Sequence, residues 1–501
     1  MSDENKSPLH RRGMKLAPKR ATAMTGRVTH AVGGAVEHAV SRHHRRRLRK
    51  VGWEFAFDAD GLGYATGATF PPRAGNKVDV LVDGSVYLPA VAAELEKATS
   101  HVHLLGWCFS PDLHLTRDDE PVVLRNLLSD IARRIDVRLL VWEGSPLPVF
   151  RPSKRDVDSF MEVFTSNTGI EAETDSCVRF KYSHHEKVIV VDDRVAFIGG
   201  IDLTFDGGDP FDTPAHPSHG HIGWHDVAVR IEGPAVADVA EHFRMRWRGP
   251  GEERLPTPVV QEPAGDVELQ IVRTVPERVF GPEENGDFSV LESYVRALRS
   301  AEHLVYIENQ FLWSPEIVTL LCDKLREPPN PDFRVVALLP ARPNDGADVS
   351  RGAIAALIEA DDGNERFLAC TVYARTGPLR DLVYVHAKVC IVDDRWLTLG
   401  SANLNERSLF NDSEVNIVTL DEELARTTRL RLWAEHLEVD ESKLEGDPTA
   451  IVDELWRPKA KEQLDNLESD RPLTHRLVML PGVSRRARRL SGALKSRVYD
   501  G

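Results

Sequence analysis

Two short stretches of this sequence each carry a histidine, a lysine two residues later and an aspartate five residues after the lysine. The six residues are His185, Lys187 and Asp192 in the first stretch and His386, Lys388 and Asp393 in the second. The stretches lie 201 residues apart, and a Gly-Gly or Gly-Ser pair follows each at the same distance. A single histidine and lysine at this spacing usually belong to nothing more than a half-buried strand, whereas two matched copies indicate an internal duplication.

Each stretch is predicted to form a β-hairpin that presents one imidazole and one ammonium group on the same face. The apolar runs 188–191 and 389–392 are typical of strands, in which side chains two residues apart point to the same side. The aspartate that ends each run, Asp192 or Asp393, stands next to a second aspartate, and such a pair suits a tight turn. We therefore interpret these two aspartates as residues that fix the hairpin rather than as reacting groups.

Two histidines and two lysines around one small volume suit the chemistry of a phosphodiester. The lysines offset the charge of the phosphoryl oxygens, a task that metal ions often perform. One histidine can attack phosphorus to form a phospho-histidine, while the other protonates the leaving alkoxide and then activates water or another alcohol. Asn403, in the Gly-Ser-Ala-Asn run after the second motif, adds an amide donor for the same oxygens. We expect no metal or organic cofactor in this chemistry.

Strands and helices alternate along the chain, which predicts an α/β fold. Strands are expected at 78–82, 101–108, 137–141, 304–308 and 335–339, and helices at 85–98, 122–134, 288–300 and 316–325. This alternation favours a mixed, largely parallel sheet. Because the Pro-, Gly- and Glu-rich segment Gly249–Gly265 divides the chain, we expect two duplicated α-β-α sandwich halves, 51–255 and 266–470. A pseudo-two-fold axis would relate the halves and place the active site at their interface.

Charge is divided unevenly between the ends of the chain and its body. Residues 1–50 hold 13 Lys and Arg against 3 acids, residues 471–501 hold 8 against 1, and residues 51–470 keep a net charge of −32. An acidic body argues against a nucleic-acid partner, because nucleic-acid affinity depends on neutralising phosphates. The two ends are interpreted as basic tails. The helical periodicity at 28–40 and the basic run Arg485–Lys495 fit either contact with an anionic membrane or a solvated arm.

Cysteine use and apolar content favour a cytoplasmic protein. The five cysteines are scattered singly, which argues against a disulfide framework or a zinc site and fits a reducing compartment. No apolar run reaches the roughly 20 residues needed to span a bilayer, and the first residues lack the pattern of a signal peptide. We expect a monomer that meets a membrane only at its surface.

At the paired motifs the sequence resembles the phospholipase D superfamily, whose mark is His-x-Lys-x4-Asp-x6-Gly-(Gly/Ser)-x-(Asp/Asn). The resemblance covers roughly residues 78–438 and is nearest to the phosphatidylcholine-cleaving branch that includes the eukaryotic enzymes. The segments that carry it are Tyr182–Lys187, Gly199–Thr204, Trp224–Val227, Tyr306–Phe311 and Gly400–Ser408.

By that resemblance the two histidines take different roles, with His185 as the nucleophile and His386 as the general acid. Glu414 resembles the family carboxylate that orients a catalytic imidazole through its other ring nitrogen. For its counterpart in the first half, the family pattern Arg-Trp-Asp-Thr is interrupted by an apparent insertion, which leaves Asp209 or Asp212. We choose Asp212 because a threonine follows it.

The resemblance implies a phospholipase D that hydrolyses the distal phosphodiester of a glycerophospholipid such as phosphatidylcholine. The products would be phosphatidic acid and the head-group alcohol, and another alcohol could accept the phosphatidyl group. The alternatives are a cardiolipin-synthase-like phosphatidyltransferase, a metal-independent nuclease, which the acidic body disfavours, and an inactive binding protein, which the intact motifs disfavour. Four aromatic side chains are candidates for a lipid-accepting mouth, although such side chains more often belong to a core. They are Trp107, Trp224, Phe311 and Trp313.

Overall fold

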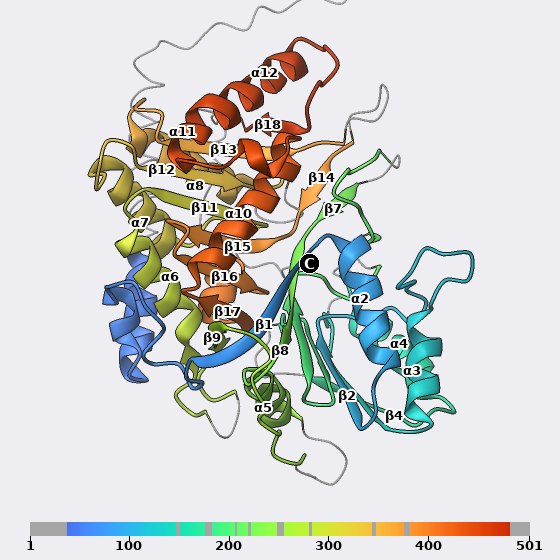
Figure 1. Ribbon diagram of the computed structural model, residues 1–501. Coiled ribbons are helices and arrows are strands. Elements are labelled where there is room, and N and C mark those ends of the chain that lie inside the picture. Colours follow the sequence, from blue (N-terminus) through green and yellow to red (C-terminus); the bar gives the residue numbers. More distant parts are fainter. Residues whose placement is uncertain are drawn as a thin grey trace, which may run out of the picture.

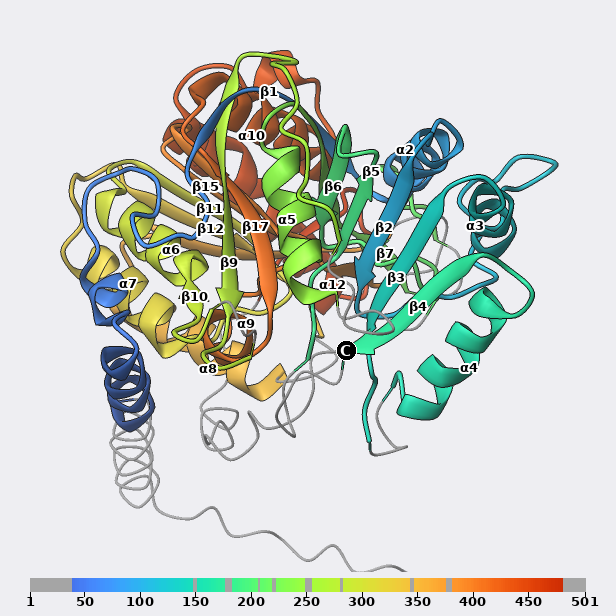
Figure 2. The same ribbon diagram turned by 90° about the horizontal axis from the view of Figure 1, so that it is seen from below.

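One long mixed sheet runs through the molecule, and helices cover both of its faces (Figures 1 and 2). The computed structural model describes residues 38–146, 151–175, 183–205, 208–218, 222–247, 255–279, 283–342, 347–374 and 381–480. The C-terminal basic run Arg485–Lys495 and most of the helix expected at 28–40 therefore lie outside the described residues. No helix within the described ranges combines the length and the apolar content that crossing a bilayer requires.

The first half of the chain supplies seven strands of the sheet. They are β1 (Arg73–Val82), β2 (His101–Gly106), β3 (Asp136–Trp142), β4 (Ile170–Asp175), β5 (Val188–Val191), β6 (Val195–Gly199) and β8 (Val227–Glu232). Helices α2 (Gly84–Glu96), α3 (Leu124–Ala132) and α4 (Lys154–Thr165) share a core with Ile189 and Val191. Helix α5 (Val236–Arg246) packs with Val188 and Val190 instead. Since successive side chains of a strand point to opposite faces, α5 covers the other face of the sheet.

The second half repeats these elements in the same sequence along the chain. Its strands are β9 (Val267–Val275), β11 (Leu304–Asn309), β12 (Arg334–Leu338), β13 (Phe367–Val372), β15 (Lys388–Val392), β16 (Trp396–Gly400) and β17 (Glu414–Thr419). Its main helices are α6 (Ser289–Ser300), α7 (Pro315–Arg326), α8 (Ala347–Asp361) and α10 (Glu422–Leu437). The remaining elements are short or terminal. They are η1 (Glu54–Asp58), β7 (Gly223–His225), β10 (Asp287–Phe288), β14 (Val383–Val385), α9 (Glu406–Phe410), η3 (Glu441–Lys443), α11 (Pro448–Ile451), η4 (Val452–Trp456), α12 (Arg457–Glu468) and β18 (Leu477–Met479).

The strand order reproduces the duplication that the paired motifs indicate. From the middle of the sheet outwards the first half reads β1-β8-β6-β5-β2-β3-β4, and the second reads β9-β17-β16-β15-β11-β12-β13, with β18 added at the edge. The halves join where β1 pairs antiparallel with β9. Each predicted hairpin therefore occupies the same place in its half, as β5-β6 and as β15-β16.

The sheet is mixed, as predicted, but the expectation of a largely parallel sheet was wrong. Within the described residues, parallel pairing in the main sheet is confined to β2-β3-β4 and β11-β12-β13. The other pairings of that sheet are antiparallel, because the motif hairpins return the chain directly and enter the sheet beside β2 and β11. Alternation of strands and helices is a local pattern and does not reveal this insertion.

Part of the expected N-terminal tail packs on the body. Residues 38–50 are helical, and His44 stacks on Phe410 with ring centroids 3.9 Å apart. Arg47 donates to Glu277 at 2.6 Å. The packed body therefore includes residues that precede position 51.

Candidate active site

The turn of each hairpin is held by its aspartate. Asp192 and Asp393 adopt left-handed backbone conformations, with φ of 58° and 55°. Asp192 accepts backbone N–H bonds from residues 99–101 at 2.8–3.0 Å, ahead of β2. Asp393 accepts the equivalent bonds from residues 302–304 at 2.7–2.8 Å, ahead of β11. Both side chains thus anchor a hairpin to the start of the neighbouring strand, in agreement with the structural interpretation.

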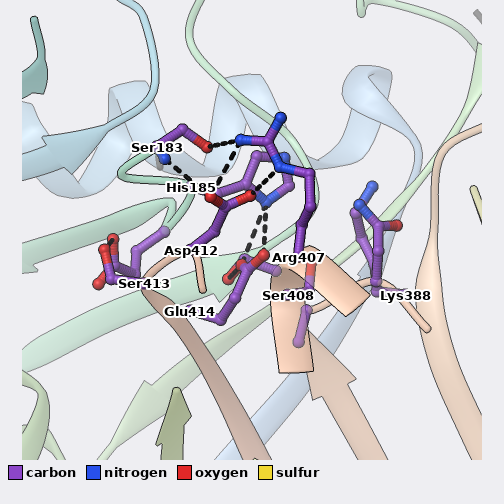
Figure 3. A network of polar contacts seen from close by, with 12 residues as sticks. Ser183, His185, Lys388, Arg407, Ser408, Asp412, Ser413 and Glu414 are labelled. Atoms are coloured by element: carbon purple, nitrogen blue, oxygen red, sulfur yellow. Dashed lines mark hydrogen bonds and ion pairs between the residues drawn. The ribbon is translucent and has the colours of Figure 1, made fainter. Parts of the chain in front are cut away.

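Each motif histidine is bound by a carboxylate from the other half of the chain. His185 Nδ1 lies 3.0 and 3.1 Å from the two carboxylate oxygens of Glu414, a contact shown in Figure 3. His386 Nδ1 lies 2.7 Å from Asp226 Oδ2. A carboxylate on Nδ1 fixes the tautomer that leaves Nε2 available to react. The two contacts therefore prepare both imidazoles in the same way.

The backbone repeats this exchange between the halves. The amide of His185 donates to the carbonyl of Ser413 at 3.1 Å, and the amide of His386 donates to the carbonyl of His225 at 2.8 Å. In both cases the acceptor is the residue directly before the orienting carboxylate. Strands β7 and β14 extend the second contact as a short parallel pair. Backbone pairing thus sets the position of each histidine relative to its carboxylate.

The choice of Asp212 as the carboxylate of the first half is corrected to Asp226. Asp212 accepts the backbone N–H of Trp224 at 3.0 Å and lies 3.3 Å from His216, so its carboxylate is engaged there. Asp209, the other candidate, is bound by Arg117 at 2.7 Å. The insertion before residue 213 favours Asp209 and Asp212 by sequence, but neither acid binds His386 in the structure. A sequence signal did exist, because Asp226 directly precedes the apolar strand β8, and Glu414 is the first residue of the apolar strand β17.

The two lysines have different surroundings. Lys187 Nζ lies 2.9 Å from Asp202 and 6.0 Å from the centroid of the Trp107 ring. Lys388 Nζ instead donates to Gln310 Oε1 at 3.2 Å, and the amide of Asn403 donates to the same oxygen at 3.2 Å.

Asp202 and Asn403 occupy equivalent positions, 201 residues apart, so one half carries an acid where the other carries a neutral amide. Asp202 was not among the predicted site residues. Its place in the Gly-(Gly/Ser)-x-(Asp/Asn) pattern was the available signal. Lys187 therefore forms an ion pair with an acid of its own half, whereas Lys388 donates to the neutral amide oxygen of Gln310.

The site is buried, and burial acts on the pKa of both motif histidines and of both orienting carboxylates. Burial, with Lys187 and Lys388 nearby, lowers the pKa of His185 well below its ordinary value of 6.5. Burial and Lys388 lower the pKa of His386 to about 4, and Asp226 acts in the opposite direction. Burial opposes the ionisation of Asp226, but its contact with His386 outweighs this and lowers its pKa. Burial raises the pKa of Glu414 well above its ordinary value.

A second polar contact braces the segment that carries His185. Arg407 donates to Asp412 at 2.8 and 3.0 Å, and Asp412 accepts the backbone N–H of Ser183 at 2.8 Å (Figure 3). Ser401 Oγ donates to Glu414 at 2.5 Å. Glu414 and the chain just before His185 are thus both held by residues of the second half.

The four candidate aromatic side chains do not form a single group. Trp224 lies beside His386, with ring centroids 5.0 Å apart, and Trp107 lies near Lys187. Phe311 and Trp313 stack on each other at 4.6 Å, and Phe311 is fully buried. Only Trp224 and Trp107 are therefore placed against groups of the site by the contacts of the described residues.

Known proteins resemble this chain in both halves. A family model described as "Cardiolipin synthase, PLD-like domain" matches residues 294–434. Phospholipase D A of Dictyostelium discoideum is 29% identical over 468 residues, covering 74% of this chain and 36% of that protein. Phospholipase D1 of Schizosaccharomyces pombe is 26% identical over 507 residues, covering 75% of this chain and 36% of that protein. Major cardiolipin synthase ClsA of Bacillus subtilis is 25% identical, covering 70% and 67%. The chain thus spans about a third of the length of the first two relatives.

Proposed function

Because this chain belongs to the phospholipase D superfamily, we propose that it cleaves the distal phosphodiester of glycerophospholipids such as phosphatidylcholine. The products are phosphatidic acid and the head-group alcohol, and a second alcohol in place of water receives the phosphatidyl group. The observation that carries the proposal is the pair of exchanged contacts, His185 with Glu414 and His386 with Asp226. They leave Nε2 of two imidazoles free to react beside two lysines.

In the first step the non-bridging oxygens of the phosphodiester lie against Lys187 and Lys388, which offset their charge. His185 Nε2 attacks phosphorus, and the bond to the head-group oxygen breaks as His386 gives that oxygen a proton. In the second step His386 removes a proton from water or alcohol, whose oxygen displaces His185. Phosphorus thereby passes through a phospho-histidine, and both imidazoles return to their starting protonation states.

The two histidine environments support this division of labour. The pKa of His185 lies well below 6.5, so its imidazole is neutral and nucleophilic. His386 faces Asp226, whose lowered pKa keeps it ionised and therefore able to stabilise an imidazolium. Burial and Lys388 lower the pKa of His386 to about 4. A bound phosphodiester anion offsets the charge of the lysines and raises the pKa of His386 toward neutrality. His386 is therefore protonated, and able to act as the acid, when substrate is bound.

A cardiolipin-synthase-like phosphatidyltransferase is the second candidate. It is favoured by the description of the family model and by the Bacillus subtilis cardiolipin synthase, of which the aligned region covers 67%. The same residues serve both reactions, because only the acceptor alcohol differs. Discrimination therefore depends on the acceptor that is offered to the phosphatidyl-enzyme.

We also propose that the protein meets its lipid at the membrane surface, as a cytoplasmic monomer without a nucleic-acid partner. Arg45 is engaged by Asp58 at 2.6 Å, Arg49 by Glu54 at 2.6 Å, and Arg47 by Glu277. These three arginines of the described helix thus form ion pairs with acids of the folded body. We therefore propose that other basic residues in the two ends of the sequence attract the anionic membrane surface.

The proposal is tested by incubating the full chain with phosphatidylcholine vesicles and ethanol. Formation of phosphatidic acid and phosphatidylethanol is expected, with loss of both in His185→Asn and in His386→Asn. His303→Asn changes an exposed histidine outside the site and should retain activity. Product formed only from phosphatidylglycerol as both donor and acceptor would favour the transferase, and cleavage of DNA alone would overturn the proposal.

A further inference from the structure

A compact group of two histidines and two carboxylates lies behind the second motif histidine. Its members are Asp83, between β1 and α2, His216 in the loop before β7, His225 at the end of β7, and Glu435 on α10. One ligand atom from each lies within 4.8 Å of all the others. The side chains of His216, His225 and Asp83 are at most 1% exposed, and that of Glu435 is 7% exposed. None of the four belongs to the proposed chemistry.

Four separations between ligand atoms of these residues are short. His225 Nδ1 lies 3.1 Å from Asp83 Oδ1 and 3.2 Å from Glu435 Oε1. His216 Nε2 lies 3.0 Å from Glu435 Oε1 and 3.6 Å from Asp83 Oδ2. Zinc binds histidine nitrogen and carboxylate oxygen at about 2.0–2.2 Å, so the edges of its tetrahedron measure about 3.4 Å. The four residues therefore offer ligand atoms within 4.8 Å of one another, which an ion can draw together to this spacing.

Each histidine also faces a second carboxylate on its opposite ring nitrogen. His225 Nε2 lies 2.8 Å from Glu308, and His216 Nδ1 lies 3.3 Å from Asp212. Metal-binding histidines commonly donate their other N–H to a carboxylate, which fixes the tautomer and strengthens the ligand. A carboxylate on the outer nitrogen of each ring is therefore the arrangement expected of two imidazoles that share an ion.

One ligand oxygen is left without a hydrogen bond. Asp83 Oδ2 is buried and has no hydrogen-bond partner among the described residues. Glu308, by contrast, is engaged by Tyr306, His225 and His436. The nearest cationic group to this oxygen of Asp83 is His216 Nε2 at 3.6 Å, beyond hydrogen-bond distance. Burying a carboxylate oxygen without a hydrogen bond is costly, so Asp83 is the acid whose bonding a cation would complete, and Glu308 is an outer partner.

We propose that Asp83, His216, His225 and Glu435 bind one structural zinc ion. Two neutral imidazoles and two carboxylates match the charge of a divalent cation, and four protein ligands leave no position for a reacting water. The ion would join the first half to α10 of the second half, directly beside Asp226. The site contains no cysteine, so the cysteine spacing carries no sign of it.

The test is independent of the proposed function, because it measures metal rather than activity. The full chain, purified without chelator, is expected to contain about one zinc per molecule. After zinc is removed, Co²⁺ should restore the thermal stability and give the intense visible absorption of a tetrahedral site. Absence of bound metal, together with no uptake of Zn²⁺ or Co²⁺ by the unaltered protein, would overturn the proposal in favour of an ion-free hydrogen-bonded cluster.

Variants separate a ligand from an outer partner. His216→Ala is expected to abolish zinc binding, whereas Asp212→Asn should weaken it roughly 10- to 100-fold while keeping the tetrahedral cobalt spectrum. His103→Gln changes a buried histidine outside the cluster and should retain one zinc. Equal zinc content in His216→Ala and the unaltered chain would contradict the assignment. Should His216→Ala fail to fold, the cobalt spectrum of the unaltered chain still decides the question.

Discussion

Glu414, in the second half of the chain, binds Nδ1 of His185, in the first half, at 3.0 Å. Conversely, Asp226 Oδ2, in the first half, lies 2.7 Å from Nδ1 of His386, in the second half. Neither half therefore contains a complete pair of imidazole and carboxylate. Separation of the halves would disable both histidines together, because each would lose the group that fixes its tautomer.

Asp226→Asn is predicted to lower kcat by roughly 10²- to 10⁴-fold, the loss typical when an amide replaces the acid that orients a catalytic histidine. Asp209→Asn alters a surface acid of the insertion, bound to Arg117, and should change kcat little. Steady-state kinetics with a soluble short-chain phosphatidylcholine measure both. Comparable kcat values for Asp226→Asn and the unaltered enzyme would show that His386 needs no such partner.

The pH dependence should differ between the free enzyme and its substrate complex. The mechanism requires protonated His386. Because the pKa of His386 is about 4 and kcat/KM reports the free enzyme, kcat/KM should fall as pH rises above that value. A bound phosphodiester anion raises the pKa of His386, which places the descending limb of kcat at higher pH. Asp226→Asn removes the charge that favours the imidazolium and should move both limbs downward. Coincident limbs for kcat and kcat/KM would refute this effect of the substrate charge.

Asp192→Asn should reduce stability and spare the chemical step. The side chain accepts three backbone N–H bonds, and an amide that replaces it costs about 1–3 kcal/mol in the free energy of unfolding. Although burial opposes it, hydrogen bonding lowers the pKa of Asp192 from 3.8 to about 2. The carboxylate contribution is therefore complete above pH 3.8 and is lost as pH falls through about 2. Urea unfolding at neutral and acidic pH should show the gap between the two proteins closing in acid. A pH-independent gap would argue against this source of stability.

Local patterns predicted the parts of the site that depend on nearby residues. The hairpins, the shared face of histidine and lysine and the turn role of Asp192 all follow from spacing within about ten residues. The partner of His386 cannot be predicted from local spacing, because Asp226 reaches His386 only when β7 pairs with β14 of the other half. The antiparallel majority of the sheet escaped prediction for a similar reason, since the neighbours of a strand are set by long-range pairing.

The insertion before β7 shows the same limit in another way. The threonine that follows Asp212 favours this acid as the partner of His386, yet the carboxylate of Asp212 faces His216. Asp83 and Glu435 lie 352 residues apart in the sequence, and only the folded chain brings them to the same two histidines. A cluster whose two acids lie far along the chain from its two histidines leaves no spacing for a sequence pattern to detect.

The phospho-histidine intermediate on His185 is tested most directly with a substrate whose leaving group departs without being protonated. With phosphatidyl-p-nitrophenol, His386→Asn needs no general acid for the first step but lacks the base for the second. One equivalent of p-nitrophenol should be released per chain in a burst, and alkaline-quenched digests should carry the phosphatidyl group on the peptide that contains His185. Steady turnover without an adduct, or no release at all from this folded variant, would contradict the account.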